Sequence, residues 1–407
     1  MTTGGANRSV DMPTIDEFAK DPCFDTDLLR LFDFDVGQYW EQVCAVRERR
    51  VALTTAVIGE EFEPATGIAE ARYDGRQEER AAKDLGVHVL ASGQVACLVL
   101  NGGLATRFGG VVKGTVNVFD NLSFLGLKIE DLRRAQSLYG RRIPLLVMNS
   151  FATKRDTAQH LTVNGCFGFE PGAIAQFDQS ISIRLTEQGD PFLGGDGKAR
   201  YYAPGHGEFF QRLHRSGLYE RLLEQGVRYL TFSNIDNLGA TVDPLLLGMH
   251  VTSRCDMTVE VIKKTKNING QWDVGGAPLV LGGSLQVVEG FRIPTSVPSG
   301  RLPDFQTNNM YFTLEALRDP PVLPRYMVNK KVEGRSSIAF EAVTCEASGV
   351  KRAGGNPWLT LNLVRVPRSG VRGRFFPVKA QEDLEMIREA LKERLESGWA
   401  LRQQELG

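Results

Sequence analysis

The feature of this sequence that most constrains its fold is an alternation of short apolar runs with amphipathic segments, which begins at residue 95. The apolar runs cover residues 95–100, 142–150 and 227–234. The amphipathic segments, in which apolar residues recur at helical spacing, cover residues 123–140, 153–165 and 219–226. Strands that alternate with helices predict a doubly wound α/β fold, with a mostly parallel mixed sheet and helices on both of its faces.

The segments before and after this alternation also show apolar patterns that predict helices and strands. Apolar residues at helical spacing in 25–54 and a charged segment at 76–84 predict a helical region over residues 1–90, most simply interpreted as a cap on the main domain. Residues 257–265 and 275–294 predict later strands, some of them in hairpins. Residues 382–398 predict an amphipathic C-terminal helix.

The composition excludes several classes of function. With 48 Lys and Arg residues against 49 Asp and Glu residues, the net charge of −1 gives no overall attraction to nucleic acid or to an anionic membrane. No apolar run approaches the ~20 residues of a membrane span, and the first residues lack the layout of a secretory signal, so we expect a cytoplasmic protein. The six cysteines are scattered without a CxxC pair, which favours free thiols over a metal or disulfide role.

Polar segments follow three of the predicted strands. They are Asn101-Gly102-Gly103, Met148-Asn149-Ser150 and Asn234-Ile235-Asp236-Asn237. In doubly wound sheets, ligands bind beyond the carboxyl ends of the strands. We therefore expect all three segments to line one crevice.

The stretch LNGGLATRFGG, residues 100–110, suggests what enters that crevice. It is not a Walker A loop, because Lys113 follows Val112 rather than glycine, and its glycine spacing is not GxGxxG. Adjacent glycines allow a base or a sugar to pack against the backbone, while exposed amides, Arg107 and Lys113 could hold polyphosphate oxygens. The alternative is a glycine-rich surface turn with incidental charges.

Six further segments follow this loop in order, and they carry a family resemblance. They are VMNSFATKRDT, FDQSISIRL, APGHGEFF, SNIDNLGATVD, FQTNNMYFTL and VPRSGVRGRFFPVK. From residue 98 to about 390 the chain resembles the eukaryotic-type UTP–glucose-1-phosphate uridylyltransferases, also called UDP-glucose pyrophosphorylases. The resemblance implies a Rossmann-like fold of the nucleotide-diphospho-sugar transferase type. Together with the helical patterns at both ends of the chain, it predicts a helical region at 1–90, a catalytic domain at 91–379 and a C-terminal helix at 380–407.

The resemblance assigns a role to residues in each segment. The nucleotide would contact Leu100, Gly102, Gly103, Gln179, Gly205 and Asp236. The sugar phosphate would contact His206, Asn234, Lys264, Glu289, Asn308 and Asn309. Asp236 would also bind the expected cofactor, Mg²⁺, which prefers one or two carboxylates together with phosphate oxygens. The catalytic cations would be Lys113, Lys379 and Arg107. For most of these site residues, a purely structural role as a surface charge, turn residue or helix cap remains an alternative.

The reaction that the resemblance implies converts UTP and glucose 1-phosphate into UDP-glucose and pyrophosphate, by in-line attack of the sugar phosphate on the α-phosphorus. The alternatives are the same chemistry on galactose 1-phosphate or N-acetylglucosamine 1-phosphate, or a homologue that binds a nucleotide sugar without turnover. Eukaryotic relatives continue into a left-handed β-helix domain, whereas this sequence ends soon after its last predicted helix. We therefore expect a compact version with UTP and a sugar 1-phosphate as its partners, and its oligomeric state stays open.

Overall fold

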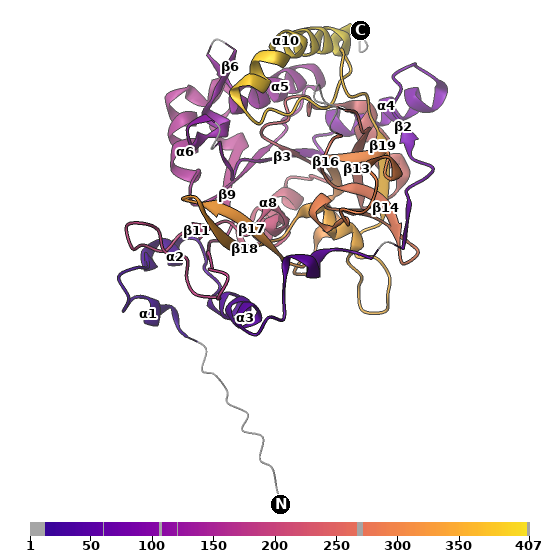
Figure 1. Cartoon of the computed structure of the whole chain (residues 1–407). Coiled ribbons are helices and arrows are strands. Elements are labelled where there is room, and N and C mark those ends of the chain that lie inside the picture. The colour runs from indigo at the N-terminus through magenta and orange to yellow at the C-terminus, as the bar shows by residue number, and fades with distance from the viewer. Residues whose placement is uncertain (1–12, 60, 106–107, 120, 267–271, 405–407) are drawn as a thin grey trace, which may run out of the picture. The chain divides into compact units, whose positions relative to one another are not determined.

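The computed structural model describes residues 13–59, 61–105, 108–119, 121–266 and 272–404 (Figure 1). The chain forms two compact units, each built from three separate segments. Unit 1 comprises Met1–Ala56, Ser180–Pro204 and Arg325–Glu341. Unit 2 comprises Val57–Gln179, Gly205–Pro324 and Ala342–Gly407, and contains every candidate site residue that the structure describes.

An eight-stranded sheet forms the centre of unit 2, in the order β2-β19-β13-β16-β12-β3-β8-β9. Its strands are β2 (Ala69–Glu70), β3 (Val95–Leu100), β8 (Leu145–Asn149), β9 (Ile174–Asp178), β12 (Tyr229–Asn234), β13 (Met257–Lys263), β16 (Asp304–Thr313) and β19 (Leu361–Arg365). The β16 strand runs antiparallel to both of its neighbours, β12 and β13, and the remaining pairs are parallel. The predicted mixed, mostly parallel sheet is confirmed.

Helices cover both faces of this sheet, because the parallel strands are apolar on both sides. Along β3, Cys97 packs into one core with residues of α4 (Gln77–Ala91), α5 (Phe124–Tyr139), α9 (Pro244–Ser253) and α10 (Gln381–Gln404). Its neighbours Ala96 and Leu98 pack into the opposite core, with residues of α7 (Phe209–Arg215) and α8 (Leu218–Glu224). This arrangement confirms the doubly wound fold.

Local signals set the ends of the helices that follow the strands. The hydroxyl of Ser123 accepts a hydrogen bond from the backbone N–H of Gly126 at the start of α5, and Gly140 ends that helix with a φ of 67°. The next helix, α6 (Lys154–Val163), follows β8 directly. The last helix, α10, extends beyond its predicted segment at both ends.

Helices α4 and α9 cross with their backbones in contact. A Cβ atom placed on Gly248 would lie 1.6 Å from the carbonyl oxygen of Ala82, and one on Gly86 would lie 1.8 Å from the carbonyl oxygen of Pro244. Glycine is therefore required at both positions. The charged segment at 76–84 belongs to a helix that packs tightly on one face.

Unit 1 contains the first helices and two hairpins. Residues 25–54 form α2 (Thr26–Leu31), α3 (Val36–Arg47) and the 3₁₀ turn η1 (Leu53–Ala56), preceded by the short α1 (Ile15–Phe18). A new helix starts at α3 because the carboxylate of Asp35 accepts a hydrogen bond from the backbone N–H of Gln38. The hairpins pair β10 (Ser182–Ile183) with β11 (Tyr201–Tyr202), and β17 (Tyr326–Val332) with β18 (Arg335–Glu341).

Smaller sheets complete unit 2. The predicted hairpin at 275–294 forms β14 (Ala277–Leu281) and β15 (Ser284–Val288), and β1 (Phe62–Pro64) adds a third strand. Thus residues 1–90 contain two short strands, β1 and β2, as well as helices. Two further pairs, β4 (Leu104–Ala105) with β5 (Val111–Val112) and β6 (Asn117–Phe119) with β7 (Leu122–Ser123), follow β3. None of the helices in the described part of the chain is long and apolar enough to cross a membrane.

Candidate active site

The three polar strand ends lie at the same edge of the sheet, as expected. In the parallel pairing of β12 with β3, Asn234 is opposite Leu100, and the carbonyl oxygen of Leu100 accepts a hydrogen bond from the N–H of Ile235 (3.0 Å). On the other side of β3, β8 ends at Asn149, whose carbonyl oxygen accepts from the N–H of Gln179 (2.9 Å). The sheet register therefore places the first glycines, Asp236 and Gln179 beyond the carboxyl ends of the strands.

Gly102 lies directly against the side chain of Gln179. A Cβ atom on Gly102 would be 2.4 Å from Oε1 of Gln179, whereas one on Gly103 would meet nothing within 4 Å. The hydroxyl of Ser150 donates to the carbonyl oxygen of Gly102 (2.7 Å). Gly102 is therefore needed for the packing of the Gln179 amide, while Gly103 leaves open space beside it.

Three segments that are distant in sequence converge at Lys113, in the 3₁₀ turn η3 (Lys113–Thr115). Its ammonium donates to Oδ2 of Asp236 (2.8 Å) and to the carbonyl oxygen of Val378 (2.5 Å). The N–H of Val378 in turn donates to the carbonyl oxygen of Asp236 (3.1 Å). The side chains of Lys113 and Asp236 are 12% and 25% exposed, so this ion pair is partly buried, with the Asp236 carboxylate the more accessible partner.

Lys379 follows Val378 directly, and its side chain is exposed. Its backbone N–H donates to Oδ2 of Asp383 at the start of α10 (2.8 Å), which fixes the main chain at this point. The structure therefore brings Lys113, Asp236 and the backbone of Lys379 together. Arg107, the third predicted cation, lies outside the described residues.

Gly205 and His206 are held against the start of η10 (Thr344–Gly349). Gly205 has a φ of 100°, and a Cβ atom there would lie 2.2 Å from the carbonyl oxygen of Ala342. The Nδ1 atom of His206 accepts from the N–H of Thr344 (3.2 Å). Burial lowers the pKa of His206 to about 4, so the imidazole is neutral at pH 7. Because Nδ1 accepts from a backbone N–H, the ring proton is on Nε2.

Asn234 and Asn308 form the next contact of the site. Nδ2 of Asn308 donates to Oδ1 of Asn234 (2.7 Å). Asn308 has a φ of 59° within β16, at an irregularity in the pairing with β13. Among the described residues, the buried Oδ1 of Asn308 has no hydrogen-bond partner. A strained residue with an unsatisfied buried acceptor is typical of a functional position.

Glu289 lies near the His206 segment, because the Cys345 thiol next to Thr344 lies 3.6 Å from its Oε2. The carboxylate of Glu289 also accepts from Nε2 of Gln306 (3.0 Å). Lys264 follows β13, and its backbone N–H donates to the carbonyl oxygen of Pro303 (2.8 Å). Burial lowers the pKa of Lys264. Lys264 thus lies at the start of β16, several residues from Asn308.

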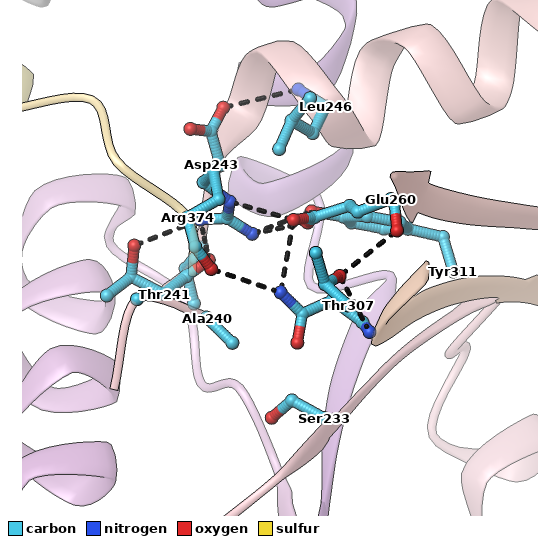
Figure 2. Close-up of polar contacts among 12 residues, drawn as sticks. Ser233, Ala240, Thr241, Asp243, Leu246, Glu260, Thr307, Tyr311 and Arg374 are labelled. Atoms are coloured by element: carbon cyan, nitrogen blue, oxygen red, sulfur yellow. Dashed lines mark hydrogen bonds and ion pairs between the residues drawn. The ribbon is translucent and has the colours of Figure 1, made fainter. Parts of the chain in front are cut away.

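The structure does not bring Asn309 to these residues. Asn309 is 2% exposed, its Nδ2 donates to Oε2 of Glu260 (3.1 Å), and its Oδ1 accepts from Nδ2 of Asn237 (3.1 Å). Both ends of its amide are thus occupied in a buried network around Arg374 and Glu260 (Figure 2). Neighbouring residues of a strand face opposite sides of the sheet, and this separates Asn309 from Asn308.

The same network contains residues that the sequence analysis did not select. Arg374 donates through Nε to Oε2 of Glu260 (3.1 Å) and through Nη1 to the carbonyl oxygen of Thr241 (2.9 Å), as Figure 2 shows. Burial opposes the charge of Arg374, but the carboxylate of Glu260 keeps the pKa of the guanidinium well above its usual value. Asn237 connects Arg374 to the end of β12, because its Nδ2 donates to the carbonyl oxygen of Arg374 (3.1 Å).

Comparison with known proteins gives the family. The sequence profile of the family described as UTP–glucose-1-phosphate uridylyltransferase matches residues 70–405. The chain belongs to this uridylyltransferase family. Among its relatives, UTP–glucose-1-phosphate uridylyltransferase 2 of Dictyostelium discoideum is 31% identical over 321 residues, a match that covers 73% of this chain and 59% of that protein. The chain therefore matches about three fifths of the length of this relative.

Solved structures support the fold of the uridylyltransferase family. The UDP-glucose phosphorylase of Trypanosoma brucei superposes with a TM-score of 0.68 at 23% identity, over 87% of this chain and 74% of that one. The uridine diphosphate N-acetylglucosamine pyrophosphorylase of the same organism gives a TM-score of 0.67 at 20% identity, over 86% and 75%. Because these two proteins are named for different sugars, the fold alone does not select a sugar.

Proposed function

We propose that this chain makes UDP-glucose and pyrophosphate from UTP and glucose 1-phosphate. An oxygen of the sugar's phosphate forms a new bond to the α-phosphorus of UTP, and the bond from that phosphorus to the bridging oxygen of pyrophosphate breaks. The attacking phosphate is already ionised at neutral pH, so the reaction needs no general base. The observation that carries the proposal is the convergence of Lys113, Asp236 and Val378, because it concentrates the charges that such a reaction needs at one end of the sheet.

The nucleotide half of the proposed site has few side chains and one well-placed amide. The backbone of Leu100, Gly102 and Gly103 would lie along the nucleoside. The amide of Gln179, packed on Gly102, can both donate to and accept from the edge of uracil. Gly205 would lie against the base, and the main chain of Ala342, which packs against this glycine, leaves no room for a side chain at this position.

The sugar-phosphate half would be formed by His206, Asn234, Asn308, Glu289 and Lys264. The neutral His206 would donate a hydrogen bond from Nε2 to the sugar's phosphate. Asn234 and Asn308, which already bond to each other, would contact the phosphate and a sugar hydroxyl, and Glu289 would accept from further hydroxyls. Asn309 is left out of this set because its amide is fully engaged elsewhere.

Catalysis at the junction of these two halves depends on positive charge. The reaction brings two anions together and builds charge on the α-phosphate and the leaving pyrophosphate, so catalysis consists mainly of positioning and electrostatic stabilisation. Lys113 and Lys379 would supply two of these charges, and Arg107 a third. The ammonium of Lys113 is held by Asp236 and the main chain, so its position is set before the substrates arrive.

The residues at Asp236 also fit a magnesium ion. Among the described residues, no group of three or more His, Cys, Asp or Glu side chains could hold a metal by itself, but Asp236 offers one accessible carboxylate beyond the end of β12. Mg²⁺ is commonly bound by one or two carboxylates together with substrate phosphates, and that donor set is the one proposed here. When bound, the ion would neutralise charge on the phosphates.

The test uses the purified protein with UTP, Mg²⁺ and a panel of sugar 1-phosphates, and measures released pyrophosphate. Glucose 1-phosphate is expected to give the fastest release, in keeping with the names of the sequence relatives. Faster release with N-acetylglucosamine 1-phosphate or galactose 1-phosphate would overturn the proposed substrate. Binding of UTP without release from any sugar would overturn the proposed enzyme and leave a nucleotide-binding homologue. Cytoplasmic residence stays a prediction.

A further inference from the structure

A lysine is buried beneath the loop that carries Asp236. Lys128, on α5, is 7% exposed, and its Nζ donates to the carbonyl oxygens of Asn237 (2.7 Å) and Ala240 (2.8 Å). The hydroxyl of Ser233 lies 3.4 Å from the same nitrogen. All three partners belong to the end of β12 or to residues 235–242, called here the Asp236 loop.

Asp131, one helical turn further along α5, contacts the same loop. Its Oδ2 accepts from the backbone N–H of Val242 (2.7 Å), and its Oδ1 accepts from Nε1 of Trp399 in α10 (3.1 Å). Asp131 is 5% exposed. Helix α5 therefore supplies both a donor, Lys128, and an acceptor, Asp131, to the main chain of one loop.

Hydrogen bonding accounts for a lysine at this buried position. Buried carbonyl groups without a partner are costly, and an apolar side chain in place of Lys128 would leave those of Asn237 and Ala240 without this donor. Burial lowers the pKa of Lys128 to about 8, with the carboxylate of Asp131 opposing the shift. Both the ammonium and the neutral amine carry enough hydrogens to donate to the two carbonyls, so the contact does not depend on the charge.

The opposite side of the loop is held by the Arg374 segment. The side chain of Asn237 donates to the carbonyl oxygen of Arg374 (3.1 Å) and accepts from the N–H of Phe376 (2.9 Å). Figure 2 shows Ala240 and Thr241 beside Arg374, and Ser233 below them. Lys128 and the Asn237 side chain thus fix the interior contacts of the loop, and Asp236, the residue before Asn237, contacts Lys113.

We propose that Lys128 is a positioning residue: by bonding to the carbonyls of Asn237 and Ala240, it sets the main chain of the Asp236 loop and thereby the placement of the Asp236 carboxylate. The expected effects of Lys128 on Mg²⁺ binding and on turnover rest on the proposed function. Its expected effect on the main chain of the Asp236 loop is independent of the proposed function.

The first test measures amide hydrogen exchange in residues 235–242. Lys128→Met keeps the length of the side chain but removes its donors, and it is expected to speed exchange in this loop, including at Val242. The matched control is Leu132→Ala, which removes a buried apolar side chain from the same helix without removing a hydrogen bond to the loop. The control is expected to lower the melting temperature without a selective change in the loop. Equal loop exchange in Lys128→Met and the wild type overturns the proposal.

The second test measures pyrophosphate release against Mg²⁺ concentration. Residues that orient metal ligands typically change metal affinity or activity by 10–100-fold. For Lys128→Met we therefore expect a half-saturating Mg²⁺ concentration raised by roughly 10-fold or more, with an unchanged KM for glucose 1-phosphate. An unchanged Mg²⁺ dependence overturns the proposal, whereas an inactive wild type would refute the proposed function and leave the exchange result valid.

A second variant covers the case in which Lys128→Met does not fold. Lys128→Gln retains an amide donor and is expected to fall between the wild type and Lys128→Met in both measurements. If Lys128→Gln matches the wild type in both loop exchange and Mg²⁺ dependence, that result counts against the proposal. The shorter glutamine side chain cannot replace both contacts of the lysine. Should neither variant fold, exchange in the wild type decides: the loop is expected to be as protected as β12, and exchange at the rate of an exposed loop overturns the proposal.

Discussion

Glu260→Gln is expected to destabilise the protein more than any exposed charge change. Glu260 and Arg374 have side chains that are 1% and 2% exposed. The carboxylate accepts from Nε and Nη2 of Arg374, from Nδ2 of Asn309 (3.1 Å) and from the hydroxyl of Tyr311 (3.1 Å). The substitution removes the charge that compensates the guanidinium and replaces one acceptor oxygen with a donor, so Arg374 stays buried without its counter-charge.

The magnitude follows from the burial of this pair. Removing one partner of a buried ion pair typically costs 3–5 kcal/mol, because the remaining charge loses its compensation. For a protein of this size, with an unfolding entropy of about 2.1 cal/mol/K per residue, that corresponds to a fall in melting temperature of roughly 4–6 °C. Arg374→Met in addition to Glu260→Gln removes both charges, so the double variant is expected to cost about 2 kcal/mol less than the sum of the single variants.

The assay is urea unfolding of the wild type, both single variants and the double variant, with thermal melts of the same samples. The control is Glu315→Gln, which breaks the exposed Arg318–Glu315 pair, 63% and 60% exposed. The control is expected to cost less than ~1 kcal/mol. A cost below ~1 kcal/mol for Glu260→Gln as well, or strict additivity in the double variant, would refute the reasoning.

Three further predictions follow from other contacts. Asp236→Asn is expected to reduce Mg²⁺-dependent pyrophosphate release by about 100–1000-fold while the melting temperature changes little; near-wild-type rates would remove Asp236 from the metal role. Gly248→Ala is expected to destabilise the protein by more than 1 kcal/mol, because its Cβ would overlap the backbone of α4; a neutral effect in urea unfolding would contradict the close helix crossing. Finally, the pKa of Lys128 in the folded protein is about 8, below its ordinary 10.5, so the unfolded chain binds more protons between these values. The free energy of unfolding should therefore rise between pH 8 and 10.5 by up to about 3 kcal/mol more in the wild type than in Lys128→Met. The groups facing this lysine are Asp131, Arg374, Asp236 and Cys97. A pH-independent difference between the two proteins would contradict this prediction.

Features with local signals were predictable from the sequence. The apolar run at 95–100 coincides with β3, and the helix predicted at 123–140 is α5, bounded by Ser123 and Gly140. The convergence of the three polar strand ends could also be predicted from the sequence, because ligands in a doubly wound sheet bind beyond the carboxyl ends of its parallel strands. These inferences need only the period of the pattern and the residue types at its limits.

Features that depend on distant partners were not predictable. A lysine in the amphipathic α5 indicates a solvated position, but Lys128 is buried because a loop more than 100 residues later supplies carbonyl oxygens. Strand β16 has Thr307, Asn308 and Asn309 at its centre, which hides its strand character in the sequence. Thr307 and Asn309 bond to Glu260, and Nδ2 of Asn308 bonds to Asn234, so the partners come from other strands and no local pattern separates Asn308 from Asn309.

The strand order of the central sheet also determines when the pairing of its strands can be completed during synthesis of the chain. The edge strand β2 ends at Glu70 but pairs with β19, which ends at Arg365. Synthesis proceeds at about 5–20 residues per second, so roughly 15–60 s separate the two strands on the ribosome. Within this period β12, which ends at Asn234, lacks its antiparallel neighbour β16 until Thr313 is made, roughly 4–16 s later, while β3, β8 and β9 are already available to pair. Until β16 is made, the nascent chain carries an unpaired sheet edge at β12, and that edge is where early aggregation or chaperone binding would begin.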